Sequence, residues 1–254
     1  MMMNNCCRHP IARISVFGIT HLQWQNPYMV AWWSATFPGF GHFLLNQYIR
    51  GMLLTLSEVI TNTLAHINEA MVYSFCGKFE LAKSVIEPKW TYGYLIIYLL
   101  AIGDSYRSAL SQNKMCQLAE LENGAIQSIK ISPSEIQYLE RKSPAVGALY
   151  SFFFPGLGQL YNHRFGLAFY AMFWWWTYLA LSNVHESLLN LLLGRMDESI
   201  SMLHPHWLLF MPSVMGGSIF HAYVTAVEHN RLFCLEQRQH LANRYRNSKV
   251  RIFP

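Results

Sequence analysis

The chain has 254 residues, of which 52% are hydrophobic and 15% aromatic, and only 13% are charged. Soluble domains carry about 25% charged residues, so the composition argues against an ordinary soluble domain and favours a polytopic membrane protein. The net charge of +5 is modest for a nucleic-acid-binding protein and suits anionic lipid headgroups better, so we expect membrane lipids and no nucleic acid as partners.

Residues 1–27 are expected to form a cytoplasmic N-terminal tail. The tail contains Arg8 and Arg13 but no long apolar core, so we predict no secretory signal peptide. The five cysteines stand at positions 6, 7, 76, 116 and 234 without a zinc-type spacing. We expect free thiols rather than disulfides or metal ligands.

A repeat organises the rest of the chain. Pro38 recurs 117 positions later as Pro155. Further pairs at this offset are Glu69 with Glu186, Trp90 with Trp207, and Asn113 with Asn230. One offset that holds over so long a stretch predicts a tandem duplication. Gly51 and Gly166 depart from the offset by two, which we interpret as a short insertion or deletion early in the second apolar segment.

Each repeat opens with an apolar run that meets a Pro-Gly-x-Gly turn. Proline disfavours helix at the residue before it, and glycine permits positive φ, so the run should stop, turn and lead into a second helix. The hairpin motif comprises Pro38, Gly39, Gly41, His42, Arg50 and Gly51, and then Pro155, Gly156, Gly158, Gln159, Tyr161, Asn162, Arg164 and Gly166. Such a hairpin suits a membrane or its interface.

Three apolar segments follow one another in each repeat. They cover about 28–46, 51–76 and 90–110, and then 144–162, 166–193 and 207–228. Roughly 20 apolar residues cross the hydrocarbon core of a bilayer, and a backbone exposed to lipid must be helical. The second and third segments are therefore predicted to span, whereas proline and glycine interrupt the first.

Two topologies compete for this all-α, polytopic fold. In one, each repeat is a re-entrant hairpin plus two spanning helices, which gives four full spans and two hairpins. In the other, the first segments also span, which gives six. The excess of basic residues on one side of the membrane is larger in the four-span topology, so the positive-inside rule favours that topology. We therefore expect a multi-pass cell-membrane protein with both termini in the cytoplasm.

The domain organisation follows from this topology. The expected parts are the tail 1–27, repeat unit 28–118, a cytoplasmic linker 119–143, repeat unit 144–235, and a basic C-terminal tail 236–254. In the linker, Ser132-Pro133-Ser134-Glu135 matches a capping box with proline at the first helical position. It predicts a short helix that continues through about Arg141.

The stretch Phe154-Pro155-Gly156-Leu157-Gly158-Gln159-Leu160-Tyr161-Asn162 is followed by Arg164 and Gly166. It resembles a pattern common in small bacterial membrane proteins and is similar to the two-transmembrane-helix domain family. The resemblance implies two helices joined by a glycine-rich turn with an aromatic and a basic residue, and a late Asp that looks like Asp104 here. The second repeat departs from that pattern with His221, and the first has His42 in place of the glutamine. The resemblance implies a multi-pass membrane protein and no particular reaction.

Several polar residues interrupt the predicted spans. Glu58, Asn62, His66 and Glu69 share one helical face, and Glu186 is the only acidic counterpart. An intramembrane carboxylate costs about 2.5–3.5 kcal/mol on insertion scales. These residues therefore predict either a polar pathway with a proton or ion site, or a seam of hydrogen bonds between helices.

Further polar residues stand at the ends of the third segments. They are Asp104, Tyr106, Arg107, Asn113, Tyr223 and Asn230. We expect structural anchoring, with a local ion pair between Asp104 and Arg107. His42 and Gln159 would either bind a headgroup phosphate, with Arg50 and Arg164, or cap the turn.

We find no nucleophile motif, phosphate-binding glycine loop or metal constellation, and we expect no enzyme activity and no cofactor. The leading hypothesis is a non-enzymatic scaffold or a module that binds lipid or a partner protein through the linker or tail, with homo-oligomerisation left open. The alternative is a small transporter or channel that uses the polar residues of the long helices. Trp174, Trp175 and Trp176 are expected to pack against the other unit.

Overall fold

The computed structural model describes residues 9–15, 17–122, 124, 126–133 and 136–245 of the chain, and these are mostly helical. The first half contains β1 (Ala12–Ser15), β2 (Gly18–His21), α1 (Pro27–Thr36), α2 (Phe40–Leu44), α3 (Tyr48–Ala65), α4 (Ile67–Phe75), α5 (Phe79–Val85) and α6 (Pro88–Leu121). The second half contains β3 (Ile129–Ile131), β4 (Ile136–Tyr138), α7 (Pro144–Phe153), α8 (Leu157–Tyr161), α9 (Phe165–Ser182), α10 (Val184–Leu192), α11 (Met196–Met202), α12 (Pro205–Leu208) and α13 (Met211–Arg244).

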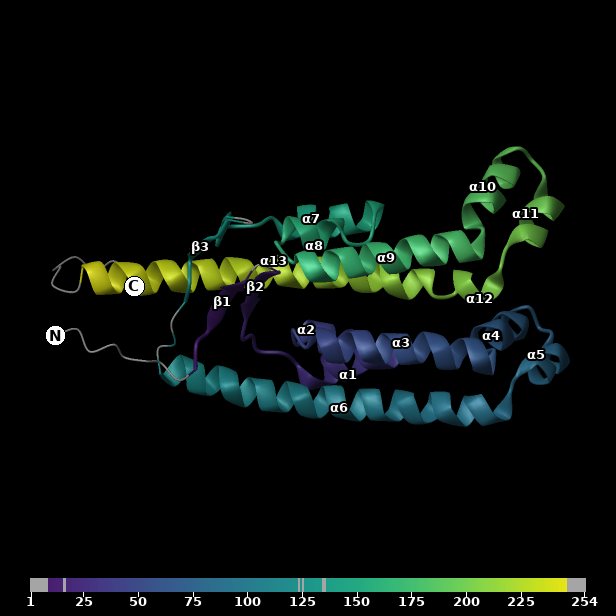
Figure 1. Ribbon diagram of the computed structural model, residues 1–254, viewed down its shortest axis with the longest axis horizontal. Coiled ribbons are helices and arrows are strands. Elements are labelled where there is room, and N and C mark those ends of the chain that lie inside the picture. The colour runs from purple at the N-terminus through teal and green to yellow at the C-terminus, as the bar shows by residue number, and fades with distance from the viewer. Residues whose placement is uncertain (1–8, 16, 123, 125, 134–135, 246–254) are drawn as a thin grey trace.

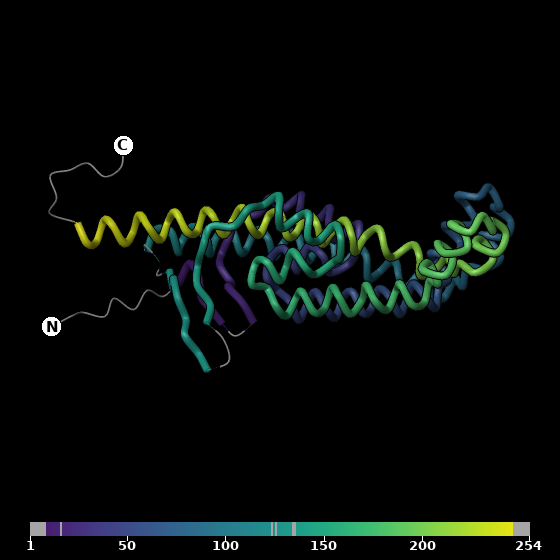
Figure 2. The backbone as a smooth tube through the Cα atoms, turned by 90° about the horizontal axis from the view of Figure 1, so that it is seen from above, coloured from purple at the N-terminus to yellow at the C-terminus, as the bar shows by residue number. Residues whose placement is uncertain are grey.

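The two halves lie side by side along one long axis (Figure 1). In each half a long helix, α6 or α13, runs back along the helix that leads away from the hairpin, α3 or α9. The pairs α4–α5 and α10–α11 lie together at one end of the molecule, away from the strands, as Figure 2 also shows. Both halves therefore point in the same direction.

The first apolar segment of each half forms a short helical hairpin. α1 begins after Asn26, whose side chain accepts a hydrogen bond from the Tyr28 amide, and it ends because Phe37 precedes Pro38 and is extended. Gly39 then takes a φ of 94° and reverses the chain into α2. Ten helical residues rise only about 15 Å, half of a hydrocarbon core of about 30 Å. The same bounds recur in α7 and α8.

The second apolar segments are not continuous helices, so the prediction of one helix over 51–76 and one over 166–193 is wrong. α3 ends where His66 takes a left-handed φ of 56°, and α9 ends where Asn183 takes a φ of 53°. Each break redirects the chain into a short helix, α4 or α10. A single left-handed residue ends the helical hydrogen bonding there, and apolar composition alone does not reveal it.

The predicted insertion or deletion is also wrong. The bounds of α1 to α5 and of α7 to α11 differ by 117 residues throughout. Gly51 therefore corresponds to Ala168 rather than to Gly166, and Arg164 corresponds to Gln47 rather than to Arg50. Gly51 near the start of α3 and Gly166 near the start of α9 are therefore not equivalent positions.

The predicted helix after Ser132 is replaced by an antiparallel pair of strands, β3 and β4, in which Ile129 pairs with Tyr138 and Ile131 with Ile136. Alternating isoleucines favour a strand over a helix, and they override the capping pattern. Ser134 and Glu135, which completed that pattern, lie outside the described residues. The tail 1–27 likewise contains the β1–β2 hairpin, and α6 and α13 run through the domain boundaries at 118 and 235.

The polar and apolar faces of α3 are reversed relative to a soluble helix. Its exposed large residues are Ile49, Leu53, Leu56, Ile60 and Leu64. Its buried residues include Thr55, Glu58, Thr61 and Asn62. Among the described residues, one helical stretch, Pro205–Arg244, is by itself long and apolar enough to cross a membrane.

Aromatic side chains fill the contact between the halves. Val59 of α3 packs with Tyr178 of α9 and with Phe210, and Trp174 and Trp175 pack against the same cluster. These two tryptophans thus belong to the cluster at which the halves meet, and the ring contacts of Trp174 are with Tyr170, Phe173 and Tyr178 of its own half. Trp176 instead is 59% exposed and contacts Phe154 of its own half.

Candidate functional site

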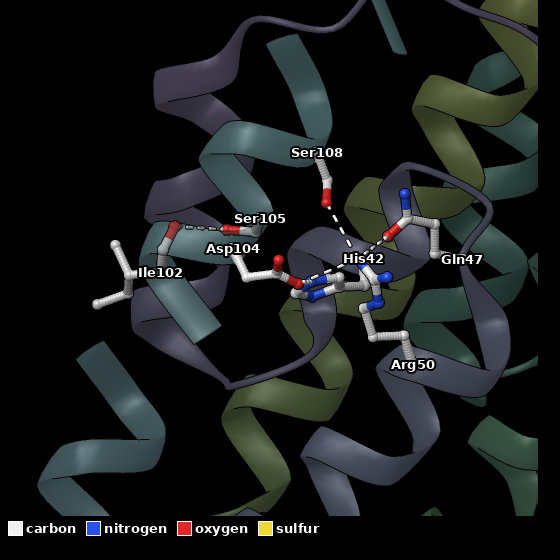
Figure 3. A network of polar contacts seen from close by, with 7 residues as sticks. All are labelled: His42, Gln47, Arg50, Ile102, Asp104, Ser105 and Ser108. Carbon is white, nitrogen blue, oxygen red and sulfur yellow. Dashed lines mark hydrogen bonds and ion pairs between the residues drawn. The ribbon is translucent and has the colours of Figure 1, made fainter. Parts of the chain in front are cut away.

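A charged cluster lies where the first hairpin meets α6 (Figure 3). The Asp104 carboxylate accepts hydrogen bonds from His42 Nε2 at 3.0 Å and from Arg50 Nη1 at 3.1 Å. Arg50 also donates to Ser108 Oγ at 3.2 Å and to Gln47 Oε1 at 3.4 Å. His42 is fully buried, whereas the Asp104 and Arg50 side chains are about half exposed.

The turn glycines bring the charged residues of this cluster together. Gly41 packs directly on Val30 and Ser34 of α1, so α2 returns close beside α1 and carries His42 to α6. Gly51 lies against the ring of Phe43 and lets α3 start next to α2. Gly39 and Pro38 form the turn itself.

An open pocket, here called the hairpin pocket, lies beside this cluster. Its polar lining includes Gln47, Arg50, Asp104, Arg107 and Ser108. The predicted local pair of Asp104 with Arg107 is replaced by the pair with Arg50, which comes from another helix. Two arginines and one carboxylate leave the pocket with a net positive charge.

The corresponding region of the second half lacks the counterparts of Arg50 and Asp104. Gln159 replaces His42; its Nε2 donates to the Ser218 carbonyl at 2.9 Å, and its Oε1 accepts from Ser151 Oγ at 3.2 Å. His221 replaces Asp104 and is buried. Gly158 packs on Gly147 just as Gly41 packs on Val30, so the hairpin recurs without its charges.

The other motif residues of the second half hold the chain together. Asn162 donates to the Ala222 carbonyl at 2.7 Å, and the Tyr161 hydroxyl accepts from the Ser143 amide at 2.9 Å. Gly156, at the turn after Pro155, takes a φ of 106°. The remaining motif residue, Gly166, lies in the first turn of α9 near Phe17.

Arg164 is buried rather than directed at a headgroup, which contradicts the expectation that it assists Gln159. Its guanidinium donates to Asn46 Oδ1 at 2.7 Å, to the Tyr48 hydroxyl at 2.6 Å and to His21 Nδ1 at 3.3 Å. Burial, and then the charge of Arg164, lower the pKa of His21 to about 3, so His21 is neutral at pH 7.

The predicted polar face of the second segment is divided by the break at His66. Glu58 and Asn62 are buried, and Asn62 Nδ2 donates to Glu58 Oε1 and to Asn68 Oδ1, each at 3.0 Å. His66 at the break forms an ion pair with Glu69 of α4, with 3.2 Å between His66 Nδ1 and Glu69 Oε2. Glu186 is half exposed beside His185 in the second half. The pair Glu58–Asn62 and the pair His66–Glu69 are therefore separate, and Asn68 connects the first pair to the His206 carbonyl through a hydrogen bond of 3.0 Å.

The polar residues at the ends of the third segments anchor the chain. Asn113 accepts from the Gln25 amide at 3.0 Å and donates to the Gln25 carbonyl at 2.8 Å. Asn230 holds the backbone of Lys142 in the same way. Tyr106 contacts the ring of Tyr28. Tyr223, the last of this set, is about half exposed.

The described residues contain no group of three or more His, Cys, Asp or Glu side chains that could hold a metal ion. Cys76, Cys116 and Cys234 are free thiols. Cys6 and Cys7 lie outside the described residues. Comparison of the chain with protein-family models, with curated proteins and with solved structures found no match.

Sequence reasoning missed the residues around Arg164, namely His21, Asn46, Tyr48 and His229. They come from both halves and are far apart in the sequence. The one available indication is that an arginine replaces Gln47 at the 117-residue offset. That substitution is hidden when Arg164 is matched to Arg50.

Proposed function

We propose that the chain is a non-enzymatic, multi-pass integral membrane protein that serves as a scaffold and binds anionic lipid headgroups at its hairpin pocket. The observation that carries the proposal is the outward apolar face of α3 over an inward polar face. In water such a helix would turn its apolar face inward, and contiguous apolar surface of this kind marks contact with a membrane or partner.

The other long helices support the same proposal. Exposed large residues continue along α6 and α9 as Tyr92, Leu95, Ile96, Leu99, Leu100, Phe169, Phe173 and Trp176. The 18 residues of α3 rise about 27 Å, close to the thickness of a hydrocarbon core. In the proposed topology α3, α9 and the apolar parts of α6 and α13 span, and the α1–α2 and α7–α8 hairpins are re-entrant.

The distribution of charge supports a cytoplasmic location for the end that carries the strands. Basic residues of elements towards that end include Arg13, Arg50, Arg107, Lys114, Lys130, Arg231, Arg238 and Arg244. The opposite end, with α4–α5 and α10–α11, carries Lys78, Lys83, Lys89 and Arg195. The positive-inside rule then places both termini in the cytoplasm. A partner protein at the linker or the basic tail, and a homo-oligomer, are compatible with this arrangement.

Single-cysteine labelling tests the topology. Cys116 is buried, so the exposed Cys234 is the better reporter for the cytoplasmic end, and Ser84→Cys reports on the opposite end. In intact cells a membrane-impermeant maleimide should label position 84 and should reach Cys234 only after lysis. Labelling of both positions from one side would refute the proposed topology.

Lipid binding at the hairpin pocket is tested in nanodiscs. We expect phosphatidylglycerol to raise the unfolding temperature relative to phosphatidylcholine, and the variant Arg50→Gln/Arg107→Gln to lose that difference. The control is Arg195→Gln at the opposite end. If the difference in unfolding temperature between the two lipids were equal in both variants, the headgroup preference would not arise at the hairpin pocket.

The alternative function is a small transporter or channel, and one observation favours it. Glu58 is buried, and its Oε2 has no hydrogen-bond partner among the described residues. A buried carboxyl without a cation must bind a proton or a cation. Its counterpart at the 117-residue offset is Trp175, so such a site would belong to the first half alone. Proteoliposome flux that survives Glu58→Gln would exclude this residue as the carrier.

A further inference from the structure

Arg164 lies at the contact between the two halves and is only 3% exposed. Asn46, Tyr48 and His21 of the first half receive its hydrogen bonds. The ring of His21 in turn lies 5.8 Å from that of His229 on α13, measured between centroids. Arg164, His21 and His229 are here called the interface cluster.

The interface cluster has a positive charge and no carboxylate to balance it. Among the described residues, no Asp or Glu forms an ion pair with Arg164, and its three hydrogen-bond partners are neutral. Arg164 is also the N-cap residue of α9, so the positive end of an 18-residue helix dipole adds to its charge. A buried guanidinium that lacks a counter-ion is costly unless an anion binds beside it.

The hydrogen-bonding atoms of the interface cluster also indicate an anion. Arg164 can only donate, so His21 Nδ1 must be the acceptor of their hydrogen bond, and the neutral ring then carries its proton on Nε2. Arg164 Nε is a buried donor without a partner among the described residues. His21 Nε2 and His229 Nε2 are also buried without a hydrogen bond there, and the Gln23 side chain lies beside His21 and raises its pKa against the larger effect of burial. Buried donors are normally satisfied. The unpaired Nε–H of Arg164 belongs to a permanently charged group, which selects for an oxyanion.

The interface cluster has no equivalent at the 117-residue offset. At the 117-residue offset, Gln47 stands for Arg164, Gln112 for His229 and Tyr138 for His21. The three side chains of the interface cluster therefore coincide at one junction only.

An open pocket adjoins the interface cluster at His21. It is lined by residues of the β1–β2 hairpin together with Asn46 and Gln112, and His21 forms part of its wall. Arg13 lines the same pocket, so its entrance also favours negative charge.

We propose that the interface cluster binds a single oxyanion group, a phosphate or carboxylate, which joins the two halves. The group belongs either to a small free anion or to a lipid headgroup that enters beside β1–β2. This site is distinct from the hairpin pocket and does not depend on the headgroup preference proposed there.

The test uses the full-length protein purified in detergent, with thermal unfolding measured in phosphate, acetate or chloride at equal ionic strength. For a free anion we expect phosphate or acetate to raise the unfolding temperature by roughly 5–10 °C at 100 times the dissociation constant. Arg164→Gln, which installs the residue of the other half, should abolish the shift. Arg195→Gln, at the far end, should keep it.

Native mass spectrometry of the same preparations identifies a lipid source. A phospholipid retained one-to-one by the unsubstituted protein and by Arg195→Gln, but lost from Arg164→Gln, supports a headgroup as the ligand even if the anions cause no shift. If Arg164→Gln does not fold, His229→Gln replaces it in both measurements. The absence of both an anion-dependent shift and a retained phospholipid overturns the proposal, since the donors are then satisfied by water alone.

Discussion

The close packing of the two helices within each hairpin can be tested by adding a single Cβ atom at Gly41 or at Gly158. A Cβ added at Gly41 would lie under 3.0 Å from the Val30 carbonyl oxygen and from Ser34 Oγ, and 3.1 Å from Val30 Cγ1. The same collision recurs at Gly158, where the carbonyl oxygen belongs to Gly147. Because one of the atoms met is backbone, rotation of a side chain cannot relieve the overlap.

The expected magnitude follows from two opposing effects. In a helix with free space, Gly→Ala stabilises by roughly 0.5–1 kcal/mol, because alanine restricts the unfolded chain. Overpacking of a tight contact costs typically about 1–3 kcal/mol. Gly41→Ala should therefore destabilise by about 1–2 kcal/mol net. Gly103 of α6 has no atom within 4 Å of its added Cβ, so Gly103→Ala should be neutral or stabilising.

Thermal unfolding in detergent measures the difference. We expect Gly41→Ala and Gly158→Ala to lower the unfolding temperature by roughly 3–6 °C, and Gly103→Ala to leave it unchanged or raise it. If Gly41→Ala and Gly103→Ala unfolded at the same temperature, the close approach of α2 to α1 would be wrong, and with it the placement of His42 against Asp104.

The remaining predictions concern polar residues. Asn113→Ala should cost about 2 kcal/mol in unfolding free energy because two hydrogen bonds to the Gln25 backbone are lost, and Asn230→Ala should cost as much; a loss below about 0.5 kcal/mol would refute the anchoring role. The unfolded chain binds a proton at His21 below about pH 6.5, whereas the folded chain does so only near pH 3. The contribution of His21 to stability should therefore decrease as the pH is lowered through this window, by about 2 kcal/mol at pH 5. The dependence of stability on pH between 7 and 5 should persist in the other variants but weaken in His21→Gln. Asp104→Asn should change stability by less than about 1 kcal/mol, because its partner Arg50 is half exposed, and urea unfolding would reveal a larger effect.

The helical fold and the hairpin turns could be predicted from the sequence. Proline before glycine ends a helix and reverses the chain through local sterics, so Pro38–Gly39 and Pro155–Gly156 are visible without any tertiary contact. The offset of 117 residues likewise relates the bounds of α1 to α5 to those of α7 to α11. These features depend on residues adjacent in sequence, or on repetition.

Breaks within apolar segments were not predictable in the same way. His66 and Asn183 adopt left-handed backbone geometry although neither is glycine, and apolar content continues across both positions. The strands β3 and β4 also prevailed over a local capping pattern, because pairing of Ile129 with Tyr138 satisfies the backbone across the turn.

The sequence by itself determined the helical class, the turns and the presence of polar residues within the apolar segments, because each depends on local sterics or on hydropathy. Only the tertiary structure decided which charges meet. Asp104 pairs with Arg50 rather than with Arg107, three positions away, and Arg164 turns inward to His21 rather than outward to solvent. Such contacts join helices and strands from distant parts of the chain. Gly41 allows α2 to approach α1 beside His42, and Gly18 allows β2 to approach the backbone of His163 and Arg164.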